Sequence, residues 1–368
     1  MSMLELKMKE LGLIKRLTNE TFKFDKRYKD GYYSASYFLK TEKIIKDEFP
    51  ETIVTMQWFT RKPTRVCGID ESIALLHTFA NNPENLKITA LHDGDYVEPF
   101  EPVLKVIGKY QDFGYLEGAI DGILARRSSV CTNCDEVMKA KSENSNIMFF
   151  GDRDDDPRNH PGDGYAAYVA GIKLVCSDAM GEWTGQKGIG TMPHALIIMH
   201  EMDLIAAATD FHKAFPNDNL TVLVDTNNDV ITDTLLIARH FNKELYGVRV
   251  DTSISLEDKY FTRNPVSDPT VETHGVNVTL IKALRKALDD EGYNHVKIVV
   301  SSGFDEEKVK LFTKENAPVD TYGIGGSLIK CTRSFTGDVV NINGKAMAKA
   351  GRKEIFSDRL EEVSYPIK

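Results

Sequence analysis

Four stretches of this chain end alike: VLVDT (222–226), GVRVDT (247–252), VKIVVSSG (296–303) and YGIGG (322–326). In each stretch a short apolar run gives way, at its carboxyl end, to charged residues, serines or glycines. Neighbouring stretches lie about 25 residues apart, with about twice that across the middle gap, which is the spacing that successive β/α units require. Because the carboxyl ends of parallel strands face one mouth, the pattern predicts a β/α barrel with a ligand site at that mouth.

The overall composition is typical of a globular protein made of two domains. At 368 residues the chain exceeds the size at which a single core stops growing. No apolar run approaches the roughly 18 residues of a membrane-spanning helix, and the charged segment 1–15 does not read as a secretory signal. A net charge of -9 argues against general nucleic-acid binding, so an anionic substrate would need a local basic pocket.

The five cysteines show no disulfide or zinc-binding pattern. Only Cys131 and Cys134 are closely spaced, and a structural zinc site needs two further ligands. We therefore interpret them as free thiols on a helix. Reduced thiols together with the missing signal predict a cytoplasmic protein.

The pattern of the chain changes near residue 120. Residues 1–120 predict an α+β domain, in which 91–108 has a turn signal at Asp93-Gly94 and alternating valines, typical of a hairpin or small barrel. Residues 121–330 predict the β/α barrel, and the basic segment 331–368 is expected to pack back on the first domain. Helical periodicity appears in Ile120–Lys141, Pro193–Phe215, Asp233–Phe241 and Val276–Asp290.

Two aromatic residues and an arginine stand in the polar stretch FFGDR (149–153). The ring of Phe150 beside the guanidinium of Arg153 would suit a flat anionic ring, through stacking and a bidentate ion pair. The alternative is a strand that ends in a solvated run of charges.

The stretch GIGTMPH (188–194) is rich in glycine and opens a predicted helix. Thr191 is a plausible N-cap, with Pro193 close to the first turn. His194 then lies where an oxyanion or phosphate would bind, so it could donate to phosphate, act as acid or base, or accept a phosphoryl group. The alternative is an ordinary polar residue at a helix start.

Charged residues follow the first two of the four apolar runs. Arg249 and Asp251 are two positions apart, so an extended strand directs both to one face. Asp225 and Asp251 could bind ribose hydroxyls or a ring nitrogen, or help to hold Mg²⁺. Each of these residues could instead be a helix N-cap in a β/α loop.

Serine and glycine residues follow the last two runs. Hydroxyl groups and glycine amides at helix N-termini bind phosphate without requiring a charge. Two such loops at the last strands of a barrel reproduce the common phosphate site of that fold. The candidate phosphate-binding residues are Ser302, Gly303, Gly325 and Gly326, together with Thr191.

With these residues in place, the chain resembles the nicotinate and nicotinamide phosphoribosyltransferase family over most of its length. The resemblance implies the type II phosphoribosyltransferase architecture, an N-terminal α+β domain joined to an irregular β/α barrel. FGDR (150–153) resembles the family's site for the pyridine ring and phosphate, and His194 in GTMPHA the histidine that ATP phosphorylates. LVDT, VRVDT and the two glycine loops match the family's ring, ribose and phosphate contacts in chain order.

The resemblance also implies a reaction, in which a pyridine nitrogen attacks C1 of 5-phosphoribosyl pyrophosphate to give a mononucleotide and pyrophosphate. Mg²⁺ would neutralise the leaving pyrophosphate, and ATP hydrolysis through His194 would raise substrate affinity. Arg153 and Arg249 would hold phosphate and carboxylate, and Asp225 would align the ring nitrogen. The enzyme would then be a pentosyltransferase that also acts as an ATP-dependent ligase in NAD salvage.

Tyr37 in SASYFLKT resembles the family's tyrosine that stacks on the ring from the neighbouring subunit. This resemblance implies an obligatory homodimer with its active site at the subunit interface. The family usually has Thr-Asp ahead of that tyrosine, whereas this chain has Ser34-Ala35-Ser36. Some members also carry a cysteine zinc cluster near the C-terminus, which is not expected here because only Cys331 lies there.

The identity of the pyridine substrate is open between the acid and the amide. Asp178 resembles the aspartate that favours the amide in nicotinamide-specific relatives, because a carboxylate there repels nicotinate. The shortness of the chain and the segment around His194 look more like the nicotinate branch, and we predict nicotinate. Two further hypotheses are a lyase or isomerase that shares only the phosphate loops, and a non-enzymatic nucleotide sensor.

Overall fold

The computed structural model describes residues 15–367, and these divide into two compact units. Unit 1 runs as far as Asp135 and takes in Tyr165–Gly171 and the residues from Lys330 on; unit 2 holds the remainder. The sequence placed the domain boundary at 120/121, whereas the units divide at 135/136. Helix α5 is one unbroken helix, Glu117–Ala140, and most of its length packs with the N-terminal residues.

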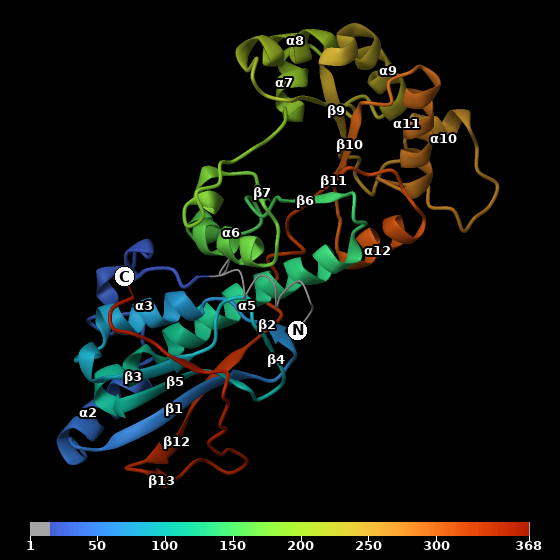
Figure 1. Ribbon diagram of the computed structural model, residues 1–368. Coiled ribbons are helices and arrows are strands. Elements are labelled where there is room, and N and C mark those ends of the chain that lie inside the picture. Colours follow the sequence, from blue (N-terminus) through green and yellow to red (C-terminus); the bar gives the residue numbers. More distant parts are fainter. Residues whose placement is uncertain (1–14, 368) are drawn as a thin grey trace. The chain divides into compact units, whose positions relative to one another are not determined.

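Unit 1 is built on a six-stranded antiparallel sheet, in the order β13-β12-β1-β5-β3-β14. The segment after residue 330, which was expected to return to the first domain, supplies three of these strands. Figure 1 shows β12 beside β1, although the two strands are distant in the sequence. The strands are β1 Ile53–Thr60, β2 Thr64–Arg65, β3 Lys87–Ala90, β4 Tyr96–Val97, β5 Pro102–Lys109, β12 Phe335–Ile342, β13 Lys345–Ala346 and β14 Glu361–Glu362, and the helices are η1 Asn19–Thr21, η2 Lys26–Tyr28, α2 Ser36–Glu48, α3 Ile69–Phe79, η3 Pro83–Asn85, α4 Tyr110–Phe113, η4 Gly114–Leu116 and α5.

Residues 91–108 do not form the predicted hairpin. The turn at Asp93-Gly94 exists, with Gly94 at φ +94°, but β4 after it pairs with β2 in a separate two-stranded sheet. Strand β5 pairs with β1 and β3 instead. The physical reason is burial, because the first five residues of β5 are all buried and a strand covered on both faces belongs inside a sheet.

Unit 2 is built on a six-stranded parallel sheet, in the order β7-β6-β11-β10-β9-β8. The four predicted runs are adjacent strands in chain order, which confirms the predicted irregular β/α barrel, here an open one. Helices α9 and α11 lie side by side next to β9 and β10 (Figure 1). The strands are β6 Asn146–Phe149, β7 Leu174–Val175, β8 Leu220–Leu223, β9 Leu245–Val250, β10 Lys297–Val300 and β11 Thr321–Ile324, and the helices are η5 Pro157–Asn159, α6 His160–Val169, η6 Asp178–Gly181, α7 His194–Met199, α8 Leu204–Ala214, α9 Val230–Phe241, η7 Asn242–Glu244, α10 Lys259–Arg263, α11 Val278–Asp290 and α12 Glu306–Lys314; α6 continues into unit 1.

The periodic stretch Pro193–Phe215 forms two helices, α7 and α8, rather than one. Glu201 and Met202 take positive φ angles of 53° and 71°, which a helix does not permit. Asp203 then caps α8 by accepting the Ala206 N–H at 2.9 Å. Within residues 15–367, no helix has both the length and the apolar character that crossing a bilayer requires.

Candidate functional site

The carboxyl ends of β8, β9 and β10 bring polar side chains from distant parts of unit 2 together. The parallel register places Leu223 opposite Arg249, and Arg249 opposite Val299. The residues that follow each strand therefore meet at one edge of the sheet, as the sequence predicted.

His194 lies between two side chains that follow β8. Its Nδ1 is 3.1 Å from the hydroxyl oxygen of Thr226, and its Nε2 is 3.7 Å from a carboxylate oxygen of Asp225. The Asp225 side chain is only 5% exposed and the His194 side chain 39% exposed. Both ring nitrogens thus face polar groups, while the imidazole stays accessible to a ligand.

Arg249, on the neighbouring strand β9, is the centre of a second set of contacts. Its guanidinium lies 3.6 Å from the carboxylate of Asp251, which confirms that these two side chains share a face. The same guanidinium donates to the Thr191 hydroxyl at 2.9 Å and lies 5.9 Å from the centre of the Phe150 ring. An arginine, a carboxylate and an aromatic face therefore converge here.

Thr191 is not the helix N-cap that the sequence suggested. Helix α7 begins at His194, with Pro193 at the cap position and no capping side chain. Thr191 lies three residues before that start, and its hydroxyl accepts a hydrogen bond from Arg249 instead. Thr191 thus joins the glycine-rich stretch to the end of β9.

Burial shifts the pKa values of Asp225 and Arg249 in opposite directions. Burial, helped by the neighbouring Asp251, raises the pKa of Asp225 to about 6, although the charges of His194 and Arg249 act against the shift. Burial lowers the pKa of Arg249, although both carboxylates favour its charge. The Asp251 carboxylate also accepts a hydrogen bond from the Ser301 hydroxyl at 2.7 Å, which links β9 to β10.

Three buried polar atoms near these strand ends have no hydrogen-bond partner within the described residues. They are Oδ1 of Asp225, Nε of Arg249 and Oγ1 of Thr252. Buried polar groups are nearly always satisfied, and an orphaned group calls for an explanation. A ligand that offers both donors and acceptors at this edge would supply it.

The loop after β10 adopts a tight left-handed turn. Ser302 and Gly303 follow one another with φ angles of +74° and +67°. A non-glycine residue in this region is uncommon and points to a local constraint. Consecutive turns of this kind can direct backbone N–H groups toward an anion.

The glycines of the loop after β11 are required for packing against the segment after β6. A Cβ atom on Gly325 would lie 2.4 Å from the Phe150 carbonyl oxygen, and one on Gly326 would lie 3.1 Å from the Asp154 carboxyl carbon. Strand β6 pairs with β11, so these segments meet despite their separation in sequence. The two glycines thus have a structural reason to be present beside their predicted phosphate role.

FFGDR contains the end of a strand followed by exposed charges, and its role in binding an anionic ring stays a prediction. Residues 146–149 are a strand, β6, and a run of exposed charges follows it. Phe150 nevertheless faces Arg249, and Arg153 is close enough for its charge to lower the Arg249 pKa. Arg153 itself is exposed to solvent.

Asp178 is exposed at the start of η6, after β7. One carboxylate oxygen accepts the Gly188 N–H at 2.8 Å and the other lies 3.6 Å from the Lys187 ammonium. The Gly188 hydrogen bond, followed by the Lys187 charge, lowers the Asp178 pKa. Its carboxylate therefore holds its own loop together.

Tyr37 lies on α2 in unit 1 and exposes 63% of its surface. Its ring contacts that of Phe38 at a centroid distance of 4.3 Å. The role of Tyr37 across a subunit interface stays a prediction.

Thr226 and Ser301 belong to the cluster at the carboxyl ends of β8 to β10 but were not predicted as site residues. Each directly follows or adjoins a residue that was chosen, and each hydroxyl contacts a charged or titratable partner. The signal was present in the sequence, because both belong to the polar run ends that define the pattern.

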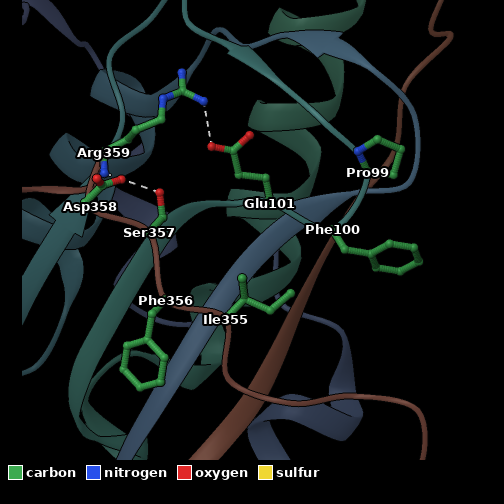
Figure 2. A pocket seen from close by; sticks show the side chains of 8 residues that line it. All are labelled: Pro99, Phe100, Glu101, Ile355, Phe356, Ser357, Asp358 and Arg359. Carbon is green, nitrogen blue, oxygen red and sulfur yellow. Dashed lines mark hydrogen bonds and ion pairs between the residues drawn. The ribbon is translucent and has the colours of Figure 1, made fainter.

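A pocket of about 560 Å³ occurs in unit 1, and it contains none of the predicted site residues. Arg359 donates to the Glu101 carboxylate at 2.6 Å, and Figure 2 shows this pair together with Phe100 and Phe356 among the residues that line the pocket. Phe356 is 83% exposed, with the Lys105 ammonium 4.9 Å from its ring centre. This pocket is lined by the β4–β5 loop and residues 355–359.

Cys131 and Cys134 are buried on α5 and form no disulfide bond. Among the residues that the structure describes, no group of three or more histidine, cysteine, aspartate or glutamate side chains could hold a metal ion.

The amino-acid sequence is similar to those of known enzymes. Residues 36–128 match the family model described as the quinolinate phosphoribosyl transferase N-terminal domain. A nicotinate phosphoribosyltransferase of Mycobacterium tuberculosis is 25% identical over 254 residues, covering 67% of this chain and 51% of the relative. The Bacillus subtilis nicotinate phosphoribosyltransferase is 23% identical, covering 65% and 45%. The chain thus spans about half the length of these relatives.

Solved structures extend the similarity across most of the chain. A nicotinate-nucleotide pyrophosphorylase from Pyrococcus furiosus superimposes with a TM-score of 0.77 and 29% identity, covering 90% of this chain and 80% of that one. Human nicotinic acid phosphoribosyltransferase gives a TM-score of 0.66 at 16% identity, covering 87% and 77%, and so shares the fold. The chain is therefore similar in sequence to nicotinate phosphoribosyltransferases, and it has the type II phosphoribosyltransferase fold of these solved structures.

Proposed function

We propose that the protein transfers the 5-phosphoribosyl group of 5-phosphoribosyl pyrophosphate to nicotinate, in NAD salvage. The products are nicotinate mononucleotide and pyrophosphate. The observation that carries the proposal is the cluster at the carboxyl ends of β8 to β10, where Arg249, Asp225 and Phe150 offer a cation, a buried carboxylate and an aromatic face. The orphaned Asp225 Oδ1 and Arg249 Nε are the polar atoms that such a substrate would satisfy.

The chemistry requires little covalent participation by the protein. The C1–oxygen bond to pyrophosphate breaks, the pyridine nitrogen forms a bond to C1, and positive charge develops on the ribose in between. The buried carboxylate of Asp225 and the partly exposed one of Asp251 stabilise that charge, since electrostatic effects strengthen as water is removed from a site. Arg249 holds the nicotinate carboxylate, and Phe150 offers its ring as a stacking surface.

Mg²⁺ fits the donor set only as an ion that the substrate brings. Mg²⁺ in phosphoryl-binding sites is commonly held by one or two carboxylates plus substrate phosphates. Asp225 has a carboxylate oxygen without a partner, and its charge interacts with that of Asp251. When bound, the ion would neutralise the charge of the departing pyrophosphate.

We extend the proposal to ATP coupling through His194. Its imidazole is accessible and lies at the helix start, with Thr226 and Asp225 holding the two ring nitrogens. A carboxylate beside the ring would stabilise the imidazolium form that carries a transferred phosphoryl group. Incorporation of radioactive phosphate from γ-labelled ATP, absent in His194→Ala, tests this step.

We also propose that the working enzyme is a cytoplasmic homodimer, in which Tyr37 of one subunit completes the site of the other. The Tyr37 ring on α2 is exposed, which leaves it accessible to a second subunit. Mixing Tyr37→Ala subunits with Arg249→Ala subunits should restore about one functional site per heterodimer. Equal inactivity of the mixture and of each variant alone would contradict the shared site.

Three pyridines are candidates for the acceptor of the phosphoribosyl group: nicotinate, nicotinamide and quinolinate. Nicotinamide is the alternative that Asp178 suggested. The Asp178 carboxylate, however, already contacts the Gly188 N–H and the Lys187 ammonium. Quinolinate is a second candidate, favoured by the family-model match and by the two guanidiniums, Arg153 and Arg249, which would suit a dicarboxylate. From quinolinate the same mononucleotide forms only if the second carboxylate leaves as carbon dioxide.

A direct assay distinguishes these possibilities. The purified protein is incubated with 5-phosphoribosyl pyrophosphate, Mg²⁺ and each pyridine, with and without ATP, and the mononucleotide is identified by mass spectrometry. Labelled carbon dioxide reports quinolinate turnover. No mononucleotide from any pyridine would contradict the proposal, and would favour a lyase, an isomerase or a non-enzymatic nucleotide sensor.

A further inference from the structure

Lys308, in the first turn of α12, turns its side chain back toward the loop after β10. Its ammonium lies 3.5 Å from the Ser302 carbonyl oxygen and 4.4 Å from the centre of the Phe304 ring. The side chain is partly buried. A lysine that could extend into solvent is instead held against the left-handed turn at Ser302 and Gly303.

No carboxylate forms an ion pair with Lys308 in the part of the chain that the structure describes. Glu306 and Glu307, which precede it, pair with Lys310 at 2.7 and 3.0 Å. Asp305 accepts the Lys308 backbone N–H at 2.9 Å as the helix cap. The nearby acids of α12 are therefore directed to other partners.

The Lys308 pKa reflects burial without an ion-pair partner. Burial lowers it, while the charges of Asp305 and of Glu272, from the loop before α11, act against that shift. A partly desolvated ammonium without an ion pair is costly and is stabilised when an anion arrives.

The surroundings of Lys308 are those of the predicted phosphate loops. The Ser327 hydroxyl, from the loop after β11, donates to the Phe304 carbonyl at 2.8 Å and so ties that loop to the residue whose ring Lys308 covers. Ser302, Gly303 and Gly326 offer hydroxyl and amide donors but no charge. Lys308 brings a cation to this otherwise neutral set of donors.

We propose that the Lys308 ammonium binds the 5-phosphate of the phosphoribosyl substrate, from the first turn of α12. The inference rests on the proposed function for the identity of the substrate, whereas the phosphate contact itself can be measured without turnover. Glu272 then acts as a weak competing anion, which the phosphate outmatches when it binds.

The experiment measures binding of ribose 5-phosphate, inorganic pyrophosphate and nicotinate by titration calorimetry. Lys308→Met removes the ammonium and keeps the apolar stem, and Lys308→Arg keeps the charge. Lys310→Met is the matched control, since it removes the same charge from the same helix at a residue already paired with Glu306 and Glu307. Thermal unfolding of each variant shows whether it folds.

Lys308→Met should weaken ribose 5-phosphate binding about tenfold or more, the effect of losing one charge-assisted hydrogen bond. Nicotinate and pyrophosphate binding should change little, and Lys308→Arg should restore most of the loss. Lys310→Met should leave all three affinities near those of the parent protein. Glu272→Gln should strengthen ribose 5-phosphate binding, a gain that a purely structural role of Lys308 does not produce.

Three results would overturn the inference. They are a parent protein that binds no ribose 5-phosphate, equal losses in Lys308→Met and Lys310→Met, and a loss confined to pyrophosphate. A protein that binds ribose 5-phosphate through Lys308 but forms no mononucleotide would support this inference and contradict the proposed function.

Discussion

At the scale of single residues, the side chains of the site are held in position by contacts with their neighbours. His194 has Thr226 at one ring nitrogen and Asp225 at the other, and Arg249 has Thr191 on one side and Asp251 on the other. Polar contacts at both nitrogens restrict the orientation of a histidine ring. Thr226 is thus a positioning residue.

Thr226→Val tests this role, because it keeps the side-chain shape and removes the hydroxyl. Loss of one hydrogen bond of this kind is worth about 1 kcal/mol, so the turnover number should fall roughly fivefold while KM for nicotinate changes little. Thr226→Ser should recover most of the rate. An unchanged rate in Thr226→Val, with unchanged thermal unfolding, would show that the Nδ1 contact does not orient His194.

The pKa of Asp225 predicts the acid side of the pH profile. The folded-state pKa is raised from 3.8 to about 6, so the carboxylate is ionised above that pH and protonated below it. Since the ionised form is the one that stabilises positive charge on the ribose, activity should decline as pH falls through about 6. Asp225→Asn should lower activity at every pH and abolish this step. A step that persists in Asp225→Asn belongs to another group.

At the scale of elements, the two glycine loops differ in what a methyl group would meet. Gly325→Ala places a Cβ atom 2.4 Å from the Phe150 carbonyl oxygen, whereas nothing lies within 4 Å of a Cβ atom on Gly303. Gly303 has a positive φ of +67°, so alanine there is strained without a clash.

We expect Gly325→Ala to destabilise unit 2 by about 1–3 kcal/mol, the usual cost of overpacking, because the backbone must move apart between β6 and β11. Gly303→Ala should cost about 1–2 kcal/mol from the left-handed conformation alone. Urea unfolding measures both losses. Equal stability of Gly325→Ala and the parent protein would mean that the β6–β11 contact is not rigid.

The strands and their order were predictable where the sequence has a repeated signal. VLVDT, GVRVDT, VKIVVSSG and YGIGG each combine a buried run with a polar end, and the structure contains all four as adjacent parallel strands. β7 is only two residues long, Leu174–Val175, and too short to show a period. The helical period at 193–215 does not indicate where the helix is interrupted. The interruption lies at Glu201 and Met202, whose positive φ angles the local sequence does not predict.

The candidate site was predictable where its residues belong to the repeated strand-end pattern, and not where they meet through distant pairing. Asp225, Arg249 and Asp251 lie at strand ends, where the register brings them together. The contact between Phe150 and Arg249 depends on β6 pairing with β11, which is separated from it by most of unit 2. Pairing between distant segments follows from packing of the whole unit and not from any local pattern.

At the scale of the whole molecule, stability should depend on pH through partly buried acids in unit 1. Burial raises the pKa of Glu117 to about 8, with Asp121 adding to the shift, and burial raises that of Asp121 to about 7, with Asp338 adding to it. Asp338 is itself paired with Lys349 and Arg352 at 3.1 and 2.8 Å. Glu117 and Asp121 are one turn apart on α5, so they face each other as like charges when both ionise.

The sign of the effect follows from proton binding. Both folded-state pKa values lie above the ordinary values of 4.5 and 3.8, so the native state holds protons that the unfolded chain releases. The contribution of these two groups to the free energy of unfolding is therefore fully present below about pH 4, and this contribution is lost as pH rises through about 7 and 8. The melting temperature of unit 1 should be higher at pH 6 than at pH 8.5.

Glu117→Gln tests this assignment, since it keeps the shape of the side chain and cannot ionise. At pH 8.5 it should stabilise the protein by about 1 kcal/mol or more, and it should flatten the decline in melting temperature between pH 6 and 8.5. The decline will not vanish, because the buried Asp93 also has a pKa raised to about 8 by burial and by Asp70. Glu84→Gln, which neutralises an exposed acid on η3, is the control and should leave the profile unchanged. Identical pH profiles for Glu117→Gln and the parent protein would show that Glu117 is already ionised in the folded state.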